Sequence, residues 1–434
     1  MKPKRQGPVE VTPSAARLTG SLRDIGYDFT SALADIVDNS VTAGAAEINI
    51  DIVFEGTNSY VVIADDGNGM SESELLEALR FGTRRNYELG ELGRYGLGLK
   101  TASLSQCRRV SVLSRRSINY RRLAAKTLDL DHILGTDRWE VTDPPAGSHC
   151  GVGATDLMNQ PGTVILWENL DRVLPERNPE GGWARRRLES LALRTRGYLG
   201  MVFHRYLEGT AARPDPLVIS VNGEKVTPWN PFAPLEENRI ELAPHSFEIA
   251  SGGLYGLVTL QRYVLPPRGQ FSSMDEFERM SGPLKWNRQQ GFYIYRVDRL
   301  IQHGGWSGIR TVDEHTKFAR ASVDFQTDLD TLFQINVAKM RATLPLEVKT
   351  LLERPIHELC HRADAVYRRD TQSRSRKKTQ ADHPGEAGGL GMGSSGIATA
   401  LISAALSVGE HDAFGRIMDQ LRLDAPDVAD SLGW

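Results

Sequence analysis

The spacing of apolar residues predicts two helices near the start of the chain, over residues 13–25 and 28–43. The second helix has the clearer apolar face, because its large apolar residues recur three and four positions apart. These residues are Phe29, Leu33, Ile36 and Val37. Gly44 follows them, and glycine in a left-handed backbone conformation commonly ends a helix.

The spacing then changes to a period of two, which predicts strands with one buried face. Apolar and polar residues alternate over 48–54, and a more uniformly apolar run follows over 60–64. Three further strands are expected, over 109–115, 119–129 and 163–167. The stretch 130–160 shows no regular pattern and is expected to be irregular.

Two more helical regions are expected in this part of the chain. Ser71 and Glu74 form an S-x-x-E capping box, which predicts a helix over 72–81 that Gly82 closes. A helix-rich stretch over 183–207 ends the first unit. Strands and helices in this mixture predict an α+β fold.

The second half opens with a boundary and a hairpin. Pro214 and Pro216 mark the boundary, and Asn222-Gly223 after an apolar run is a turn typical of β-hairpins. Strands are then expected over 255–263 and 291–296, and helices over 326–333, 346–368 and, in one or two short pieces, 397–422. The expected division of the chain is an arm over 1–12, domains over 13–213 and 214–370, a basic, Gly- and Ser-rich linker over 371–396, and a helical tail over 397–434.

Composition narrows the class of protein only slightly. The chain has 434 residues, a net charge of −3 and an ordinary globular balance of 40% hydrophobic and 25% charged residues. Three scattered cysteines without C-x-x-C spacing favour a reducing compartment and argue against a structural zinc site. No apolar run approaches the length of a membrane span, so we expect a cytoplasmic protein without a membrane partner.

Candidate chemistry begins on the helix over 28–43. Asp35 and Asn39 are four positions apart, which places their side chains on one helical face, where they can share a water or a metal ion. Taken alone, such a pair is more often a solvated helix face. Two glycine-rich segments further along the chain change this balance.

The first segment is Asp65-x-Gly67-x-Gly69, at the end of a predicted strand. Taken alone it is most simply a turn, although its carboxylate can accept a hydrogen bond from an exocyclic amine such as that of adenine. The second is Gly93-x-x-Gly96-x-Gly98 before a helix, where backbone N–H groups and the helix dipole favour phosphate. Its spacing fits neither a Rossmann fingerprint nor a Walker A motif, which it misses by one residue.

Together, these segments in this order resemble the GHKL (Bergerat-fold) ATPase superfamily. The similarity is closest to MORC-like and bacterial MutL-like members and is specific over about residues 14–170. The resemblance implies an α+β Bergerat-fold ATPase domain, with helices on one face of a mixed sheet, followed by an α/β transducer domain of the ribosomal-protein-S5 type. It also implies ATP and Mg²⁺ as cofactors.

The resemblance assigns roles position by position. Asn39 is expected to hold Mg²⁺, Asp65 to accept the adenine amine with Thr163 beside it, and Asp35 to act as general base. The remaining expected nucleotide-binding residues are Gly67, Gly69, Met70, Gly82, Thr83, Gly93, Arg94, Tyr95, Gly96, Leu97, Gly98, Lys100 and Thr101. Among these, the glycines from Gly93 to Gly98 and Lys100 are expected to wrap the phosphates.

The general base departs from the family's usual pattern, which has Glu at this position. Asp35 is one methylene shorter, which favours slow hydrolysis. Asp38 ranks below it because it lies one residue before Asn39 and therefore about 100° round the helix from that residue. Lys339, in Asn336-Val337-Ala338-Lys339, resembles the MutL lysine that reaches the terminal phosphate; a solvated surface lysine is its simpler interpretation. Arg296 and Arg299 are expected at the surface.

By resemblance, the protein is a slow ATPase that acts as an ATP-gated homodimeric clamp in DNA handling, repair or defence against foreign DNA. A nuclease or helicase is the implied partner protein. The basic stretch 368–378 is a candidate DNA contact, although a solvated helix end explains it equally well. The alternative is a chaperone-like or scaffold protein that uses ATP as a switch on protein clients. A histidine kinase is disfavoured, because no dimerising phospho-acceptor helix precedes the ATPase segment.

Overall fold

The computed structural model describes most of the chain between residues 13 and 381. The described residues are 13–24, 26–82, 98–117, 119, 123–157, 160–174, 180–213, 215–251, 253–335, 342–381 and 419–420. The chain divides into two compact units, Met1–Asp370 and Thr371–Trp434. The two sheets and the candidate site all lie in the first unit.

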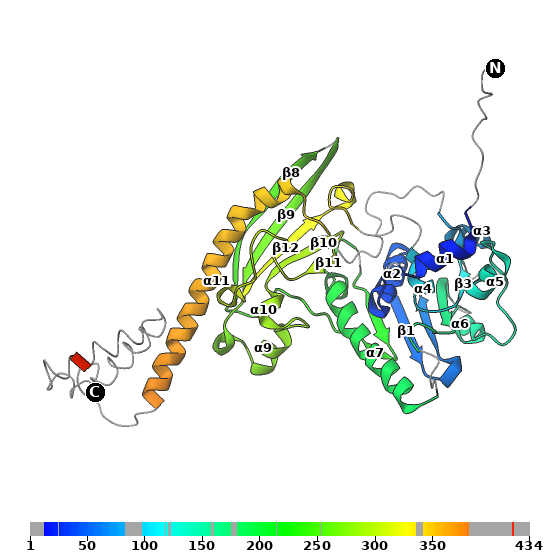
Figure 1. Ribbon diagram of the computed structural model, residues 1–434, viewed down its shortest axis with the longest axis horizontal. Coiled ribbons are helices and arrows are strands. Elements are labelled where there is room, and N and C mark those ends of the chain that lie inside the picture. The colour runs from blue at the N-terminus through cyan, green and yellow to red at the C-terminus, as the bar shows by residue number, and fades with distance from the viewer. Residues whose placement is uncertain are drawn as a thin grey trace, which may run out of the picture. The chain divides into compact units, whose positions relative to one another are not determined.

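A seven-stranded mixed sheet forms the first half of this unit (Figure 1). Its strand order is β4-β3-β5-β2-β1-β6-β7, and every pairing is antiparallel except β1 with β6. The strands are β1 (Glu47–Val53), β2 (Tyr60–Asp65), β3 (Arg109–Arg115), β4 (Ala124–Asp129), β5 (Gly162–Glu168), β6 (Val218–Val221) and β7 (Glu224–Lys225). The strands expected over 48–54, 60–64, 109–115 and 163–167 are therefore confirmed.

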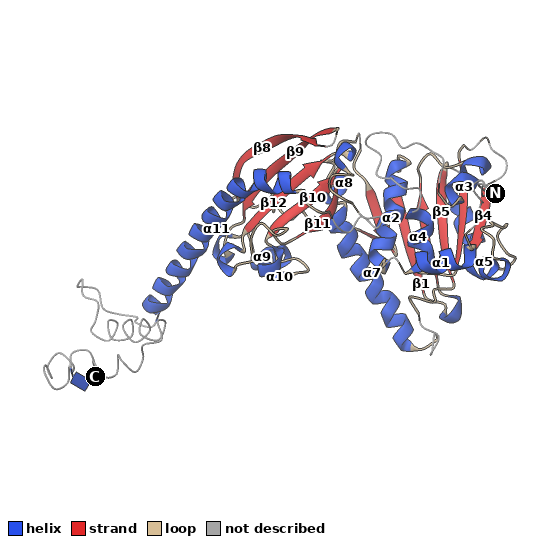
Figure 2. Ribbon diagram, turned by 45° about the horizontal axis from the view of Figure 1, so that its top comes forward, coloured by secondary structure: helices blue, strands red, loops and turns tan. Residues whose placement is uncertain are grey.

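Helices cover the sheet, most of them on one face. Figure 2 shows α1, α2 and α4 lying across the same side of the strands. The helices are α1 (Ala15–Arg23), α2 (Phe29–Thr42), α3 (Glu72–Leu79), α4 (Gly98–Leu104), α5 (Leu130–Thr136), α6 (Cys150–Asp156), α7 (Gly182–Val202) and α8 (His204–Leu207). The opposite face has its own small core, where α6 packs on β3 and β5. The predicted α+β class with a mixed sheet is confirmed.

Local signals located several of these elements correctly. The capping box of α3 forms as expected, with Ser71 and Glu74 exchanging hydrogen bonds. Gly44 has a φ of +77° just after α2, and Asn222-Gly223 joins β6 to β7 with positive φ at both positions. The expectation that the stretch 130–160 is irregular was wrong, since it contains α5 and α6. These helices are too short to show a clear apolar period in the sequence.

The sheet also continues past residue 213, where the first domain was expected to end. β6 lies parallel to β1, with Ile48 opposite Ile219, and β7 follows as a hairpin. Pro216 lies in the loop before β6, and Pro214 lies outside the described residues. Pairing with a strand some 170 positions earlier leaves no trace in the local pattern.

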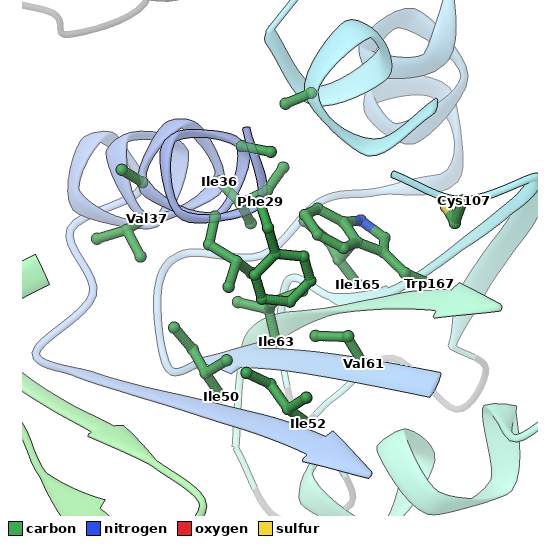
Figure 3. Packing of buried hydrophobic residues seen from close by; sticks show 14 of the residues in the cluster. Phe29, Ile36, Val37, Ile50, Ile52, Val61, Ile63, Cys107, Ile165 and Trp167 are labelled. Atoms are coloured by element: carbon green, nitrogen blue, oxygen red, sulfur yellow. The ribbon is translucent and has the colours of Figure 1, made fainter. Parts of the chain in front are cut away.

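The core beneath α2 explains why this helix is so strongly fixed. Figure 3 shows Phe29, Ile36 and Val37 of α2 facing strand residues such as Ile63 and Trp167. The rings of Phe29 and Trp167 meet edge to face, with centroids 6.1 Å apart. On β1, buried and exposed residues alternate as predicted, so the isoleucines of this strand face the helix layer.

A five-stranded mixed sheet forms the second half, in the order β11-β10-β12-β9-β8. Its strands are β8 (Ile240–Ser251), β9 (Leu254–Val264), β10 (Gly291–Arg296), β11 (Arg299–His303) and β12 (Ala319–Phe325), and its helices are α9 (Met274–Met280), α10 (Lys285–Gln289) and α11 (Leu346–Ala381). The strands expected over 255–263 and 291–296 are confirmed as β9 and β10. The helix expected over 326–333 is only the 3₁₀ turn η4, Thr327–Leu329.

The long helix α11 packs its N-terminal half on this sheet. Val348, Leu352, Ile356 and Leu359 recur at helical spacing, and all are fully buried in the core that the sheet residues form. The helix was expected to end at 368 but runs to Ala381, so the first part of the expected linker is helical. Within the described part of the chain, no helix is both long and apolar enough to cross a membrane.

Candidate functional site

The first site residue, Asp65, lies at the C-terminal end of β2, where three elements meet. Ser40 of α2 donates a hydrogen bond of 2.7 Å to its Oδ2, and the backbone N–H of Gly67 donates one of 3.0 Å to its Oδ1. Thr163 of β5 is its direct neighbour across the sheet. Burial raises the pKa of Asp65, and the hydrogen bonds from Ser40, Gly67 and Thr163 oppose this rise. The result is a nearly buried acceptor held in a fixed orientation.

The glycines after Asp65 are required by close packing of the backbone. Gly69 has a φ of +61°, and a Cβ at this position would lie 2.0 Å from the carbonyl oxygen of Arg115. A Cβ on Gly67 would lie 2.9 Å from the carbonyl oxygen of Ala43, just after α2. The next residue, Met70, donates its backbone N–H to Ser114 of β3. The D-x-G-x-G turn is therefore packed between the end of α2 and β3. A turn on the surface would not need glycine for this reason.

The pair on α2 has two different environments. Asn39 is exposed, whereas Asp35 is 1% exposed. The hydroxyl of Tyr27 donates a hydrogen bond of 2.5 Å to Oδ2 of Asp35, and burial together with Asp35 raises the pKa of Tyr27, which keeps it a neutral donor. A solvated helix face is therefore the wrong interpretation for Asp35.

The start of α4 lies directly beside this carboxylate. A Cβ on Gly98 would lie 3.5 Å from Oδ2 of Asp35, so the end of the second glycine-rich segment lies next to the residue expected to act as general base. Thr101, one turn along α4, is buried and hydrogen-bonds to the hydroxyl of Tyr27. The fold thus brings Asp35 together with Gly98 and Thr101 from a segment some 60 positions away.

Lys100 is placed differently from what the resemblance implied. Its ammonium donates hydrogen bonds of 2.8 and 2.7 Å to the carbonyl oxygens of Ala78 and Arg80, at the end of α3. Such terminal carbonyls have no partner within their own helix, so a cation satisfies them well. Burial lowers the pKa of Lys100 to about 8. In this structure the side chain caps α3, and the expected phosphate contact would require it to leave these carbonyls.

The remaining predicted residues divide into two groups. Gly82 is described, exposed and in a left-handed conformation with a φ of +70°. The others lie outside the described residues: Thr83, Gly93, Arg94, Tyr95, Gly96, Leu97 and Lys339.

The structure adds one residue that the sequence interpretation placed wrongly. Arg299 was expected at the surface but is 1% exposed, and its Nε donates a hydrogen bond of 2.8 Å to Oδ1 of Asp38 on α2. Its Nη2 lies 3.9 Å from Oδ1 of Asp35. Burial works to lower the pKa of Arg299, but Asp38, Tyr198 and Asp35 together outweigh this effect and raise the pKa. Arg296 is also buried, in a bidentate pair with Asp330.

A strained hairpin delivers Arg299 to α2. The turn between β10 and β11 consists of Val297 and Asp298, both with positive φ, at 49° and 62°. Each non-glycine residue with positive φ adds about 1–3 kcal/mol of backbone strain, so this conformation persists only where surrounding contacts hold it. Here α8 holds the turn, because Arg205 pairs with Asp298 at 3.1 Å and the Tyr206 hydroxyl donates to the carbonyl of Val297 at 2.6 Å.

One sequence signal pointed to these arginines. Both stand in a stretch, Phe292 to Ile301, whose only other charged residue is Asp298, and a charge inside a buried strand needs a partner of opposite charge. The sequence does not say that Asp38, 261 positions earlier, is the partner of Arg299.

Fold and site together define the class of this protein. A mixed sheet is covered on one face by α2 and α4, and an acidic residue and a glycine turn stand at a strand end, an arrangement that matches the α+β fold expected for a Bergerat-type domain. The family model described as histidine kinase-, DNA gyrase B-, and HSP90-like ATPase matches residues 27–160. Residues 27–160 are therefore similar to the ATPase domain of the GHKL family.

Three relatives refine this assignment. ATPase morc-1 of Caenorhabditis elegans is 33% identical over 86 residues, covering 20% of this chain and 10% of that protein. Protein MICRORCHIDIA 5 of Arabidopsis thaliana is 34% identical over 96 residues, covering 20% of this chain and 14% of that protein. DNA mismatch repair protein MutL of Aliivibrio salmonicida is 30% identical over 148 residues, covering 33% of this chain and 22% of that protein. The matched part thus spans a minor fraction of each relative, and the similarity to MORC proteins and MutL is confirmed.

The buried pair makes a prediction for stability. Arg299→Met leaves Asp38 charged and without this partner, so it is expected to lower the free energy of unfolding by about 3–5 kcal/mol. Adding Asp38→Asn removes the stranded charge, and the two changes are expected to show an interaction energy of about 1–3 kcal/mol. Urea denaturation of the single and double variants measures both quantities.

The matched control is Arg80→Met, which removes an exposed pair with Glu77. Its cost is expected to stay below about 1 kcal/mol. Additive effects of Arg299→Met and Asp38→Asn would contradict the pairing.

Proposed function

We propose that this protein is a slow, Mg²⁺-dependent ATPase whose nucleotide state is passed through α2 to the second sheet. One observation carries the proposal: α2 places Asp35 beside Gly98 at the start of α4 and pairs Asp38 with Arg299 of the second sheet. A change at the nucleotide would therefore act on a helix that packs in the core of the first half and is ion-paired to the second.

The residues at the strand end fit an adenine nucleotide. Asp65 is an oriented acceptor for an exocyclic amine, and the glycine turn leaves no side chain above it. Asn39, exposed on α2, offers the amide oxygen that hard cations such as Mg²⁺ prefer. When bound, Mg²⁺ would neutralise part of the charge on the phosphates. Thr163, beside Asp65, can add a water-mediated contact to the base.

Asp35 is the proposed general base, and its surroundings support slow turnover. One of its oxygens already accepts a short hydrogen bond from Tyr27, and Arg299 lies near the other. These contacts hold the carboxylate in place but leave fewer positions for an attacking water. The shorter side chain of Asp, compared with Glu, acts in the same direction.

The proposed output is an ATP-gated homodimeric clamp that acts on DNA. Two things support it: the similarity to MORC proteins and to a protein named for DNA mismatch repair, and the ion pair between α2 and the second sheet. Lys339 is proposed to contact the terminal phosphate, and 368–378 to contact DNA. A nuclease or helicase is the proposed partner protein.

Two substitutions separate binding from hydrolysis. Asn39→Ala is expected to weaken Mg²⁺-dependent ATP binding by at least about tenfold, equivalent to about 1.4 kcal/mol. Asp35→Asn keeps the size and the hydrogen-bonding partner of the side chain but removes the base, so ATP should still bind while kcat falls about 10²–10⁴-fold. Calorimetry and phosphate release measure the two effects.

Glu189→Gln, an exposed change on α7, serves as the control and should alter neither quantity. Equal turnover in Asp35→Asn and the unmodified protein would show that the base lies elsewhere.

The clamp predicts a change in oligomeric state with nucleotide. A non-hydrolysable ATP analogue with Mg²⁺ should convert monomers to dimers, which light scattering after size-exclusion chromatography would detect. Asn39→Ala is expected to stay monomeric under the same conditions. Unmodified protein that binds the analogue and remains monomeric would rule out the clamp.

A DNA role predicts turnover that depends on DNA and on basic residues of 368–378. Duplex DNA should raise ATP turnover at low salt, and Lys377→Ala with Lys378→Ala should weaken this response. Lys225→Ala with Arg288→Ala removes two exposed cations elsewhere and should leave the response intact. Turnover that does not respond to DNA would favour a scaffold acting on protein clients.

A further inference from the structure

A cavity of about 970 Å³ lies at the end of α2 remote from Asn39. Its walls come from the first turn of α2, one face of α7, and loops of the second half that include Trp229 and Gly282. Cavities of 300–1,000 Å³ are the usual size for small-molecule sites. Asn39, Asp65 and the glycine turn do not line it, so it is separate from the nucleotide site.

The face of α7 gives the cavity a mixed chemical character. Its lining residues recur four and three positions apart, as one helical face requires. They are Arg187, Leu191, Arg194, Tyr198 and Met201. With Tyr27, Phe29 and Trp229 opposite, the cavity has apolar and aromatic walls beside guanidinium groups.

Positive charge exceeds negative charge on these walls. Five arginines line the cavity, against two aspartates, Asp24 and Asp28. Three of the arginines form ion pairs: Arg23 with Asp171, Arg172 with Asp24, and Arg279 with Glu276. Within the described residues, Arg187 and Arg194 have no carboxylate within ion-pair distance.

The two arginines of α7 suit an anion of a particular kind, although Arg187 also donates a hydrogen bond of 2.6 Å to the carbonyl oxygen of Val173. A guanidinium binds a carboxylate, phosphate or sulfonate group through paired hydrogen bonds, and aromatic side chains stack on a flat apolar body. Arg194 is exposed, so its guanidinium is available to a ligand. The matching ligand is a small organic anion with an aromatic or other flat apolar part.

The inner wall of the cavity also borders the carboxylates of the nucleotide site. Tyr27 lines the cavity, and its hydroxyl is hydrogen-bonded to Asp35. Tyr198, from α7, lies within electrostatic range of Arg299, Asp38 and Asp35. A ligand in the cavity would therefore press on side chains that touch the proposed general base.

We propose that this cavity is an effector site for a small organic anion, which changes the rate of ATP turnover through Tyr27 without competing with ATP. The effect on turnover rests on the proposed ATPase function, whereas binding of the anion does not. The two parts are therefore tested separately.

Binding is tested on the full chain with 8-anilinonaphthalene-1-sulfonate, an aromatic sulfonate whose fluorescence rises in apolar surroundings. The probe should bind saturably, and Arg194→Glu should weaken binding at least tenfold. Arg186→Glu is the matched control, since it makes the same charge change on an exposed residue of α7 outside the cavity wall, and it should bind like the unmodified protein. Equal affinity in Arg194→Glu, or displacement of the probe by Mg-ATP, would overturn the proposed site.

Coupling is tested by steady-state kinetics with and without the probe. The probe should change kcat at least twofold while leaving KM for ATP unchanged, and Tyr27→Phe should bind the probe but lose this response. Binding through Arg194 with no change in kcat would overturn the coupling. If the protein hydrolyses no ATP, the proposed function fails, and the binding measurements still decide whether the cavity is an anion site.

Discussion

The buried ion pair between Arg299 and Asp38 is the constraint on which the nucleotide half of the molecule depends. Both side chains are removed from water, and the loss of hydration costs several kcal/mol for each ion. The attraction between the two charges offsets this cost only when they are in close contact, so α2 and the β10–β11 hairpin must keep one relative position. The same requirement fixes Asp35, one turn earlier on α2 and within reach of the same guanidinium.

Other features of the fold support this contact. The hairpin that carries Arg299 has a turn that neither valine nor aspartate adopts readily, and α8 holds it through Arg205 and Tyr206. On the other side, the packing of α2 on β1, β2 and β5 prevents the helix from moving toward the arginine. The ion pair therefore joins the core of the first half to the second sheet, and contacts on both sides support it.

Helix α2 joins three environments within a few turns. Ser40 orients Asp65 at the strand end, Asp35 lies beside Gly98 at the start of α4, and Asp38 pairs with the second sheet. The proposed effector cavity touches the first turn of the same helix and reaches Asp35 through Tyr27. Nucleotide, second sheet and cavity thus share one element, which is the physical reason to expect coupling among them.

The sequence by itself determined what depends on near neighbours along the chain. The apolar period of α2, the alternation of β1, the capping box at Ser71 and the Asn222-Gly223 turn are local effects, and each appears where expected. The order of the glycine-rich segments was sufficient to indicate the family, since it is also written along the chain. Short helices such as α5 and α6 escaped because seven residues show too little of a period.

Only the tertiary structure decided which distant charges meet. It placed Arg299 against Asp38, moved Lys100 to the end of α3, and paired β6 with β1 beyond the expected domain boundary. It also showed that Asp35 is buried and bonded to Tyr27, which a helical spacing of four does not reveal. A buried charge must find a partner, but the sequence specifies only the requirement, while the folded backbone determines which partner lies within reach.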